Sequence, residues 1–391
     1  MAERNRLLVK IIQDRLAEKQ PYIQVLVGPR QVGKTTALRA ALGQRGVYHS
    51  ADYPTPLPAE VIAEWWAEAE RAPARILAVD EVQKITNWAP ALKAAWDRGT
   101  GIKVIVAGSS ALLVEKGLTE TLAGRFELIR AEHWNYQEAR HVFGQSVAEF
   151  IEFGCYPGAA PLLADIPRWG AYVRDAIVEP ALGRDLLQLH PVGSPALLRQ
   201  VFGATVALPA QVLSLAKLQG HLQERGSLPT LQQYLRLLAH AFLVTGVEKY
   251  SASLFRSRKS SPKLIAHDNA LLRAFERPII APLTAERFGR YFENAVGARF
   301  IEAGWETFYW RHRHHEVDFV VIGPLNQRYA VEVKTAPTDL KGLSGVFAFC
   351  KLHPDFAPRL VSLHDQQLAG VETLTVAEVL SLNRLSQEHA V

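Results

Sequence analysis

The stretch IQVLVGPRQVGKTT, residues 23–36, decides the fold of the N-terminal part of this chain. Ile23–Val27 is short and rich in apolar and β-branched residues, which predicts a buried strand. Gly28–Thr36 follows with the spacing GxxxxGK[ST] of a phosphate-binding loop. Good helix formers then run from Thr36 to Leu42 and stop at Gly43. A strand, a glycine-rich turn and a helix start predict backbone N–H groups that face a phosphate chain.

The loop residues have separate expected roles in binding ATP. The glycines let the backbone approach the phosphates, Lys34 reaches the β- and γ-phosphates, and the Thr35 hydroxyl is offered to Mg²⁺. The residues expected to bind the nucleotide in this loop are Gly28, Pro29, Arg30, Gln31, Val32, Gly33, Lys34, Thr35 and Thr36.

A second strand pattern, Arg75–Val79, ends in the adjacent carboxylates of Asp80 and Glu81. Asp80 is expected to hold Mg²⁺, and Glu81 to orient and polarise the water that attacks the γ-phosphate. An acidic pair at a strand end is common, so Asp80 and Glu81 are strong evidence for a nucleotide site only together with the phosphate-binding loop upstream. Together the two motifs predict a P-loop ATPase of the additional-strand type.

Two further positions near this expected site have alternative interpretations. The apolar strand Lys103–Ala107 runs into Gly108-Ser109-Ser110, where Ser109 or Ser110 either senses the γ-phosphate or only caps a helix. Arg125, just before the strand-like Phe126–Arg130, is either an arginine finger, in its own chain or on a neighbouring subunit, or part of a surface salt bridge. The finger interpretation makes a homo-oligomer plausible.

These motifs, in this order, resemble the prokaryotic AAA-type ATPases that carry a C-terminal module of formerly unknown function. Asp80-Glu81-Val82-Gln83 and Leu122-Ala123-Gly124-Arg125 are similar to landmarks of that family. The later segments Ser261–Asp268 and Glu332-Val333-Lys334 are similar as well, so the resemblance covers nearly the whole chain. It implies an AAA-like core followed by a winged-helix segment and a restriction-endonuclease-like domain of the PD-(D/E)XK type.

The middle of the chain has the order of a winged helix-turn-helix. Gln211–Tyr250 suggests two amphipathic helices, separated by a turn at Arg225–Pro229 and followed by a strand. Polar residues of the second helix, Thr230–Ala241, form a plausible groove-facing side: Gln232, Gln233, Arg236 and His240. The basic residues beyond it, Arg256, Arg258, Lys259 and Lys263, either neutralise phosphates or belong to a solvated loop.

The C-terminal part contains a second candidate active site. A helix pattern over Ala285–Ala303 precedes strands around Thr307–Trp310, Val317–Ile322 and Tyr329–Val333. The residues expected to share the metal centre of a nuclease are Glu293, Asp318 and Glu332, with Lys334 as the catalytic lysine. A degenerate domain could keep the same residues for structure or for binding nucleic acid. The run Arg311–His315 precedes Asp318 and either lies near a bound phosphate or metal or, as the simpler interpretation, is a solvated basic turn.

Composition limits the possible functions without choosing one. With 391 residues, 48% apolar and 21% charged, the chain has the material for two or three globular domains. No apolar run reaches the roughly 20 residues of a membrane span, and no secretory signal is apparent, so we expect a cytoplasmic protein. Cys155 and Cys350 are far apart and belong to no CxxC or Cys/His ligand pattern, which argues against a disulfide framework or a structural zinc site. A net charge of +5 permits an anionic partner but does not prove one.

The sequence thus predicts an α/β chain: an AAA-type P-loop ATPase core, helical and winged-helix segments, and a C-terminal α/β restriction-endonuclease-like domain. The expected limits are 1–150 for the ATPase domain, 151–208 for a helical linker or lid, 209–270 for the winged helix and 271–391 for the nuclease-like domain. The expected activity is Mg²⁺-dependent ATP hydrolysis on or near DNA, with a metal-dependent nuclease. The alternative is an ATP-controlled switch that binds a protein or DNA, with an inactive nuclease-like domain.

Overall fold

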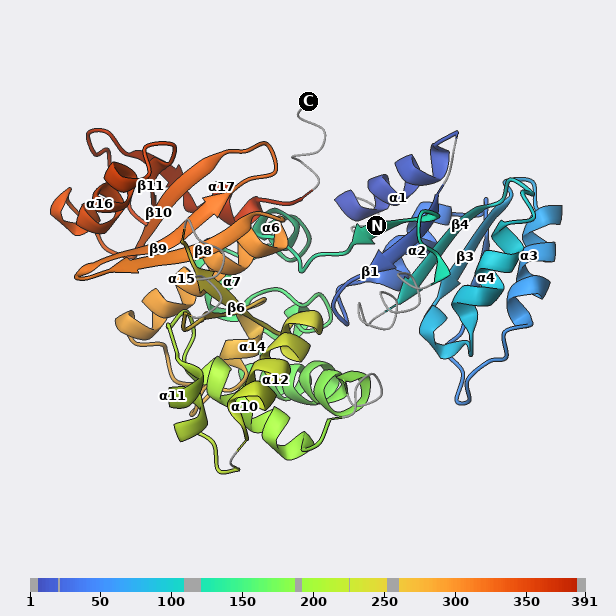
Figure 1. Cartoon of the computed structure of the whole chain (residues 1–391), viewed down its shortest axis with the longest axis horizontal. Coiled ribbons are helices and arrows are strands. Elements are labelled where there is room, and N and C mark those ends of the chain that lie inside the picture. The colour runs from blue at the N-terminus through green and yellow to red at the C-terminus, as the bar shows by residue number, and fades with distance from the viewer. Residues whose placement is uncertain are drawn as a thin grey trace. The chain divides into compact units, whose positions relative to one another are not determined.

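The computed structural model of the chain describes residues 6–19, 22–108, 121–186, 192–224, 226–251 and 260–384, without the side chains of residues 184 and 185. The chain divides into two compact units, Met1–Glu132 and His133–Val391. Figure 1 colours the first unit from blue to teal and the second from green to red. Among the described helices, none has the length and apolar character that crossing a membrane requires.

A five-stranded parallel sheet forms the centre of the first unit. The strand order is β2-β3-β4-β1-β5, and all of the pairings are parallel. The strands are β1 (Ile23–Val27), β2 (Val47–Ser50), β3 (Ile76–Asp80), β4 (Lys103–Gly108) and β5 (Phe126–Arg130). Because β4 lies between β1 and β3, the predicted additional strand is confirmed.

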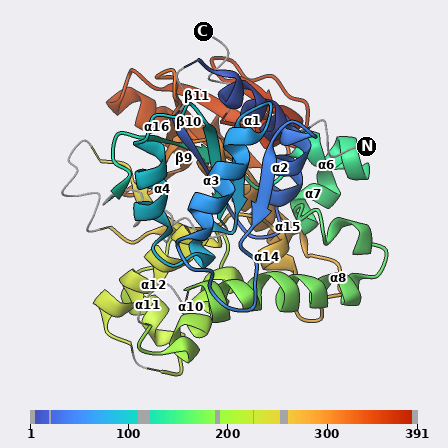
Figure 2. The ribbon, with the colours of Figure 1, turned by 90° about the vertical axis from the view of Figure 1, so that its right-hand side faces the viewer.

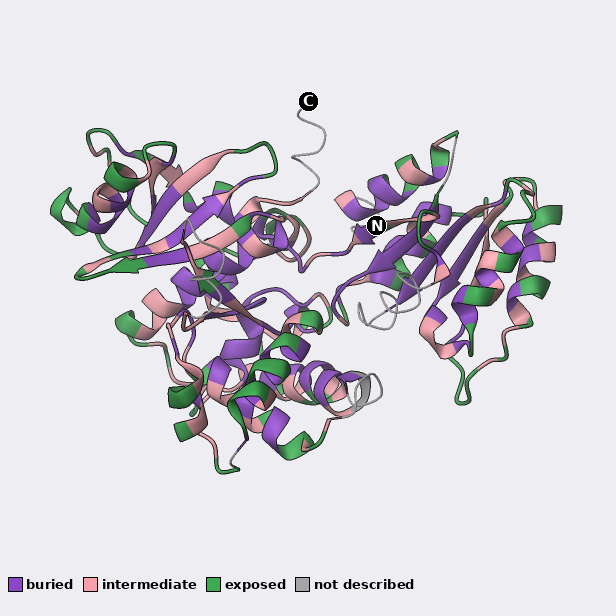
Figure 3. Cartoon of the chain, in the orientation of Figure 1, coloured by how far each residue is buried: buried purple, intermediate pink, exposed green. Residues whose placement is uncertain are grey.

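Helices cover this sheet because its strands are apolar on both faces. The first-unit helices are α1 (Leu7–Ala17), α2 (Lys34–Leu42), α3 (Val61–Arg71) and α4 (Trp88–Trp96), with a short 3-10 helix η2 (Val82–Lys84) after β3. Helices α3 and α4 pack side by side, and so do α1 and α2 (Figures 1 and 2). Alternate residues of β1, β3 and β4 share one buried core with α3 and α4, and Figure 3 shows these strands almost wholly buried. The rigid sheet fixes where the loops at its carboxyl edge lie.

The second unit begins with a series of helices. Its first helices are α6 (Tyr136–Phe143), α7 (Val147–Phe153), η3 (Ala160–Leu162), α8 (Ile166–Tyr172) and the π-helical turns η4 (Val173–Val178) and η5 (Ala181–Asp185). They are followed by α10 (Pro195–Ala207), α11 (Leu215–Gly220), α12 (Leu228–His240) and α14 (Ala270–Arg273). Asn135 and Ser146 begin α6 and α7 with capping boxes. The expected polar side of α12, which carries Gln232, Gln233, Arg236 and His240, is exposed.

One mixed sheet of seven strands organises the rest of the second unit, in the order β12-β11-β10-β9-β8-β6-β7. Its strands are β6 (Val244–Lys249), β7 (Lys263–Ala266), β8 (Glu306–His312), β9 (His315–Ile322), β10 (Arg328–Lys334), β11 (Ala357–Ser362) and β12 (Glu372–Thr375). The helices of this region are α15 (Ala285–Glu302), η6 (Lys341–Leu343), α16 (Ser344–Leu352) and α17 (Val376–Ser381). Strand β6 pairs antiparallel with β7 and parallel with β8, so the β6–β7 hairpin belongs to the same sheet as the later strands. The boundary expected near residue 270 therefore runs through a shared sheet.

The segment Ser261–Asp268 is part of the core of this unit. The Asn294 side chain of α15 bonds both the N–H and the carbonyl of Ala266, at 2.9 Å each. The Asp268 carboxylate accepts from the N–H groups of Cys155 at 3.0 Å and Ala270 at 2.7 Å. Gly154 must be glycine, because a Cβ there would lie 1.8 Å from Asp268 Oδ1 and its φ is +60°. This segment therefore holds β7, α7 and α15 together.

Candidate nucleotide site and acidic centre

The phosphate-binding loop lies between β1 and α2, as the sequence predicts. Gly28 follows β1 so closely against the end of β5 that an added Cβ would lie 2.3 Å from the Ala131 carbonyl oxygen. Gly33 begins α2 in the left-handed region, with φ at +87°. Close approach at one glycine and the backbone angle at the other explain why both positions need glycine.

Lys34 lies inside this loop. Its side chain is buried, and Nζ donates to the carbonyl oxygens of Gly28 at 2.9 Å and Pro29 at 2.5 Å. The loop's own carbonyls thus hold the ammonium at the start of α2, where the helix dipole also favours anions. A phosphate oxygen is a stronger partner for this ammonium than a neutral carbonyl.

The Thr35 hydroxyl and the Asp80 carboxylate meet at the carboxyl edge of the sheet. Thr35 Oγ1 donates to Asp80 Oδ2 at 2.6 Å, although 45 residues separate the two. Asp80 is buried and also accepts from Tyr48 OH at 3.1 Å and from the Glu81 N–H at 3.0 Å. Burial and the adjacent Asp80 carboxylate raise the pKa of Tyr48, which keeps the phenol protonated as a donor. Oxygen ligands of this kind fit Mg²⁺.

Glu81 has an unusual backbone conformation beside this pair. Its φ is +53° and its ψ is +40°, a region that non-glycine residues seldom adopt. The Gln83 amide donates to Glu81 Oε2 at 2.6 Å and so fixes the direction of the carboxylate. Strain of this kind tends to be kept where a side chain must point in one direction.

Sequence reasoning missed three residues that support this site. Tyr48 and Gln83 hold the two carboxylates, and Gln83 lies in a segment already singled out by resemblance. The buried Arg6 guanidinium donates to the carbonyl oxygens of Val32 and, at 2.7 Å, Glu132. No local signal marks Arg6, because its partners are 26 and 126 residues away.

The remaining predicted nucleotide residues are distributed around the loop. Pro29 and Val32 are buried, Arg30 is half-buried, and Gln31, Thr35 and Thr36 are exposed. Gln31 has φ at +60°, which completes the turn before Gly33. Ser109 and Ser110 lie outside the described residues, so their role stays a prediction.

Arg125 lies at the opposite edge of the sheet from the loop. Its carbonyl accepts from Ile23 N–H, at the first residue of β1, whereas the loop follows the last. Its guanidinium makes two bonds to Asp97, at 2.8 and 3.3 Å. This position corrects the expectation of a finger acting in its own chain, since roughly five residues at 3.3 Å each separate the two edges. A role on a neighbouring subunit stays a prediction.

In the second unit, the predicted acidic residues share one region of the sheet. Glu293 comes from α15, Asp318 from β9 and Glu332 from β10. Asp318 Oδ2 accepts from the Val333 N–H at 2.9 Å, and Lys334 Nζ donates to Glu332 Oε1 at 2.6 Å. A cavity of about 440 Å³ lies beside them, lined by Asp318 and Glu332 together with Arg290, Arg311 and Glu316.

Lys263 occupies the centre of this acidic group and was not expected there. Its side chain is 1% exposed, and Nζ contacts Glu293 Oε1, the Asp318 carbonyl at 3.0 Å and Asp318 Oδ1 at 3.7 Å. Nζ also lies 4.6 Å from the centre of the Phe319 ring. Lys263 is therefore not available to contact phosphates at the surface. Arg256, Arg258 and Lys259 lie outside the described residues.

Burial dominates the electrostatics of these carboxyl groups. Burial and the Asp318 charge raise the pKa of Glu293 to about 7 and that of Glu332 to about 8, against the lowering effect of the neighbouring lysines. The same carboxylates raise the pKa of Lys263 and of Lys334 despite burial, so both ammonium groups stay charged. Among the described residues, Glu293, Asp318 and Glu332 do not bring one oxygen each within 4.8 Å of one another. We call these three carboxylates with Lys263 and Lys334 the acidic centre.

The histidine-rich run forms the turn of the β8–β9 hairpin. Arg311, His312, Arg313 and His314 are exposed there, and Arg311 lies 3.8 Å from Glu316. The exposure of these residues agrees with a solvated basic turn, whereas Arg311 also lines the cavity beside Asp318 and Glu332.

In comparison with known protein families, three consecutive parts of the chain match three family models. Residues 20–140 match the family model of an AAA domain. Residues 144–279 and 288–383 match two models described as domains of unknown function, DUF8612 and DUF4143. An uncharacterized protein of Mycobacterium tuberculosis is 27% identical over 333 residues, which cover 83% of this chain and 72% of that protein. An uncharacterized protein of Haemophilus influenzae is 23% identical, with coverage of 82% and 84%.

Solved structures give weaker likenesses. A Walker-type ATPase of Pyrococcus abyssi has a TM-score of 0.45 at 15% identity, over 69% of this chain and 95% of the other. The RuvB branch migration motor of Thermotoga maritima has a TM-score of 0.32 at 15% identity, over 63% and 94%. Such low scores support no inference, and the AAA domain match and the strand order stand without them. The first unit has the fold of an AAA-type P-loop ATPase.

Proposed function

We propose that the first unit hydrolyses ATP, with Mg–ATP as its substrate. The observation that carries this proposal is the 2.6 Å bond between Thr35 Oγ1 and Asp80 Oδ2. It brings together the loop hydroxyl and the strand-end carboxylate that a magnesium nucleotide needs, next to Lys34. The direct test is phosphate release from ATP by the full chain, with Mg²⁺ and with a chelator in its place.

Each side chain has a definite task in this reaction. Lys34 leaves the Gly28 and Pro29 carbonyls for the β- and γ-phosphate oxygens and neutralises charge there. Thr35 and Asp80 hold the magnesium of the substrate. Glu81, directed by Gln83, accepts a hydrogen bond from the attacking water and aligns it with the γ-phosphate. Tyr48 keeps Asp80 in place.

We further propose that the second unit binds DNA through the exposed polar side of α12. A cavity of about 460 Å³ adjoins that side, lined by Gln232, Arg236, Thr245 and Gly246 among others. Amides and a guanidinium are the groups that read base edges and contact phosphates.

The DNA proposal predicts a salt-dependent affinity that Arg236→Ala reduces. Loss of one phosphate contact should weaken binding of duplex DNA by about 3- to 10-fold and lower the slope of log affinity against log salt by about 1. Filter binding over a salt series measures both quantities. Arg168→Ala on α8 removes an exposed arginine elsewhere in the same unit and should leave both unchanged. Equal affinities for Arg236→Ala and the parent would remove α12 from the interface.

Two candidates remain for the acidic centre, and Lys263 favours the one without cleavage. The order α15-β8-β9-β10-α16-β11 and the residues Glu293, Asp318, Glu332 and Lys334 support a nuclease-like domain. Lys263 Nζ, however, lies between Glu293 and Asp318, where a divalent cation would have to bind. A charged, buried lysine compensates the same carboxylates that the metal would compensate. We therefore propose a nuclease-like centre that Lys263 holds closed, within an ATP-controlled switch.

A cleavage assay with Mg²⁺ separates the closed centre from an active nuclease. We expect the parent chain to cut single-stranded and duplex DNA no faster than Asp318→Ala or Lys334→Ala, with and without ATP. Cleavage by the parent that either variant abolishes would instead establish the nuclease and would show that Lys263 leaves the centre. Circular dichroism of each variant checks that it is folded.

A further inference from the structure

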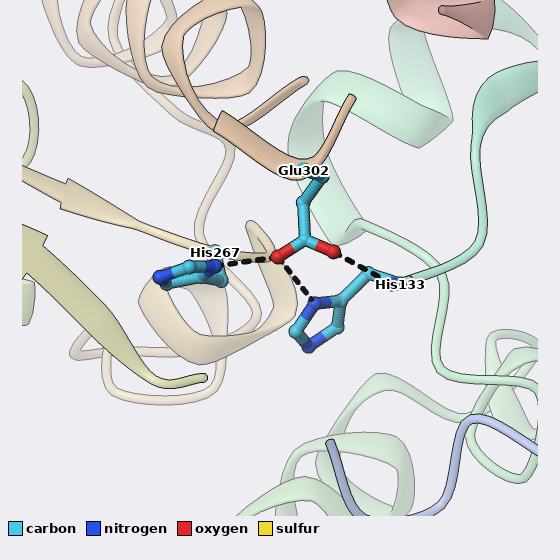
Figure 4. A group of neighbouring side chains, drawn as sticks. All are labelled: His133, His267 and Glu302. Carbon is cyan, nitrogen blue, oxygen red and sulfur yellow. Dashed lines mark hydrogen bonds and ion pairs between the residues drawn. The ribbon is translucent and has the colours of Figure 1, made fainter. Parts of the chain in front are cut away.

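Outside both sites, two histidines and a glutamate from distant segments meet in the second unit. His133 follows β5, His267 follows β7, and Glu302 is the last residue of α15. All three are buried, with 2%, 7% and 7% of their surfaces exposed. One ligand atom from each lies within 4.8 Å of the others. Figure 4 shows both imidazole rings beside the Glu302 carboxylate.

Both imidazoles present the same nitrogen to the same oxygen. His267 Nδ1 lies 2.5 Å from Glu302 Oε1, and His133 Nδ1 lies 3.3 Å from it. The other oxygen, Oε2, accepts from the His133 backbone N–H at 3.0 Å. Oε1 is thus the point on which both rings converge, while Oε2 fixes the carboxylate.

Hydroxyl groups bind the other ring nitrogens. His267 Nε2 lies 2.6 Å from Thr245 Oγ1, and His133 Nε2 lies 3.0 Å from Tyr156 OH. Metal-binding histidines commonly donate from the second nitrogen to a neighbouring oxygen, which leaves the first nitrogen with a free lone pair. If both Nε2 atoms donate here, two Nδ1 lone pairs face a carboxylate oxygen, and only a cation makes that arrangement favourable.

The His133 Nδ1 atom distinguishes this group from an ordinary hydrogen-bonded network. It is buried and forms no hydrogen bond, although it points at Glu302 Oε1. Buried ring nitrogens are almost always satisfied, and an exception calls for an explanation such as an ion. A proton shared only by His267 and Glu302 would leave His133 Nδ1 unsatisfied.

The group also has room for an ion. A space of about 20 Å³ is lined by His133, His267 and Glu302, together with Asp268 and Asn269, and one water needs roughly 10–15 Å³. Bonds of about 2.0 Å in a tetrahedral site place the ligand atoms about 3.3 Å apart. The His133 pair already has this separation, and the His267 pair must open by less than about 1 Å.

The charged groups around these three residues also favour a bound cation. The buried carboxylates of Glu302 and Asp268 lie near each other, and Arg299 is a positive group nearby, with NH1 donating to the His133 carbonyl at 3.3 Å. Two carboxylates in the interior are costly unless positive charge lies beside them, and a divalent cation bound by Glu302 would supply such charge.

We propose that His133, His267 and Glu302 bind one Zn²⁺ ion through Nδ1, Nδ1 and Oε1, with a water as the fourth ligand. Two imidazoles and a carboxylate suit zinc better than magnesium or calcium, which prefer sets made of oxygen alone. Because the site is buried, the ion enters as the unit folds and stabilises it. Its role is structural: it fixes residue 133 to β7 and α15.

The test is the metal content of the full chain, produced with zinc in the medium and freed of loosely bound ions by desalting. We expect about one zinc ion per chain, measured by inductively coupled plasma mass spectrometry. Glu302→Gln, which keeps the shape of the side chain, should hold less than a tenth of this amount. Glu276→Gln changes a half-buried glutamate of the same unit, outside both the proposed ligands and the acidic centre, and should keep the parent's zinc.

A second measurement does not depend on variants. The parent chain unfolded, freed of metal and refolded with Co²⁺ should show the strong visible absorption of a four-coordinate cobalt site, and Zn²⁺ should displace it. A folded parent chain that retains neither zinc nor cobalt would overturn the proposal and leave a hydrogen-bonded His–Glu group. Equal zinc in the parent and a folded Glu302→Gln would also overturn it.

Discussion

Lys34→Ala is expected to weaken ATP binding by about 100-fold, equivalent to about 2.7 kcal/mol, and to abolish measurable hydrolysis. The ammonium is buried inside the loop, and in the proposed reaction it neutralises charge on the β- and γ-phosphates. Alanine removes that charge and leaves the carbonyls of Gly28 and Pro29 near the phosphate oxygens. Titration with a fluorescent ATP analogue gives the affinity, and phosphate release gives the turnover.

Lys10→Ala is the matched control for this change. Lys10 is an exposed lysine on α1 of the same unit, so the substitution changes the net charge equally without touching the loop. It should bind and hydrolyse ATP as the parent does. If Lys34→Ala bound ATP within about 3-fold of the parent, the loop would not be the phosphate site.

Glu81→Gln is expected to bind ATP as tightly as the parent and to hydrolyse it about 100-fold more slowly or worse. Glutamine keeps the size of the side chain and can still bond Gln83, but it cannot accept a proton from the attacking water. Binding depends on Lys34, Thr35 and Asp80, which the change leaves in place. Single-turnover hydrolysis with enzyme in excess separates the chemical step from product release.

Glu64→Gln on α3 provides the control, because it neutralises an exposed glutamate of the same unit. Its turnover should equal that of the parent. Parental turnover in Glu81→Gln would assign the activation of water to another group. Weaker ATP binding would place Glu81 among the binding residues instead.

The elements of the first unit were predictable because local sequence and spacing determine them. β1 and β5 have the predicted limits, and α2 begins two residues earlier than predicted, at Lys34. The loop and the strand-end carboxylates lie together because the carboxyl ends of parallel strands share one edge. A motif defined by phosphate geometry is therefore visible in the sequence before any tertiary contact is known.

The parts that were missed depend on contacts between distant residues. Lys263 looked like one of several surface cations, and only the pairing of β6 with β7 and β8 buries it against Glu293. Arg6 meets the loop through backbone carbonyls, which carry no sequence signal. The predicted position of Arg125 directly before β5 is confirmed. Its distance from the loop was not predictable, because it depends on the direction in which β5 runs beside β1 in the sheet.

His133 and Glu302 were not recognised for the same reason, since 169 residues separate the two. Neither belongs to a short spacing pattern of cysteine and histidine ligands, which is the signal that marks a zinc site in a sequence. Tertiary packing brings these proposed ligands together, because it places His133 and His267 beside the last residue of α15.

Three consecutive residues after β5 have a consequence for communication along the chain. The Ala131 N–H donates to the Val27 carbonyl at 2.7 Å, the Glu132 carbonyl accepts from Arg6, and the His133 N–H donates to Glu302. The last residue of the first unit, Glu132, and the first residue of the second, His133, are therefore each bound within their own unit. A change at either anchor would alter the backbone at the junction where the two units meet in the chain.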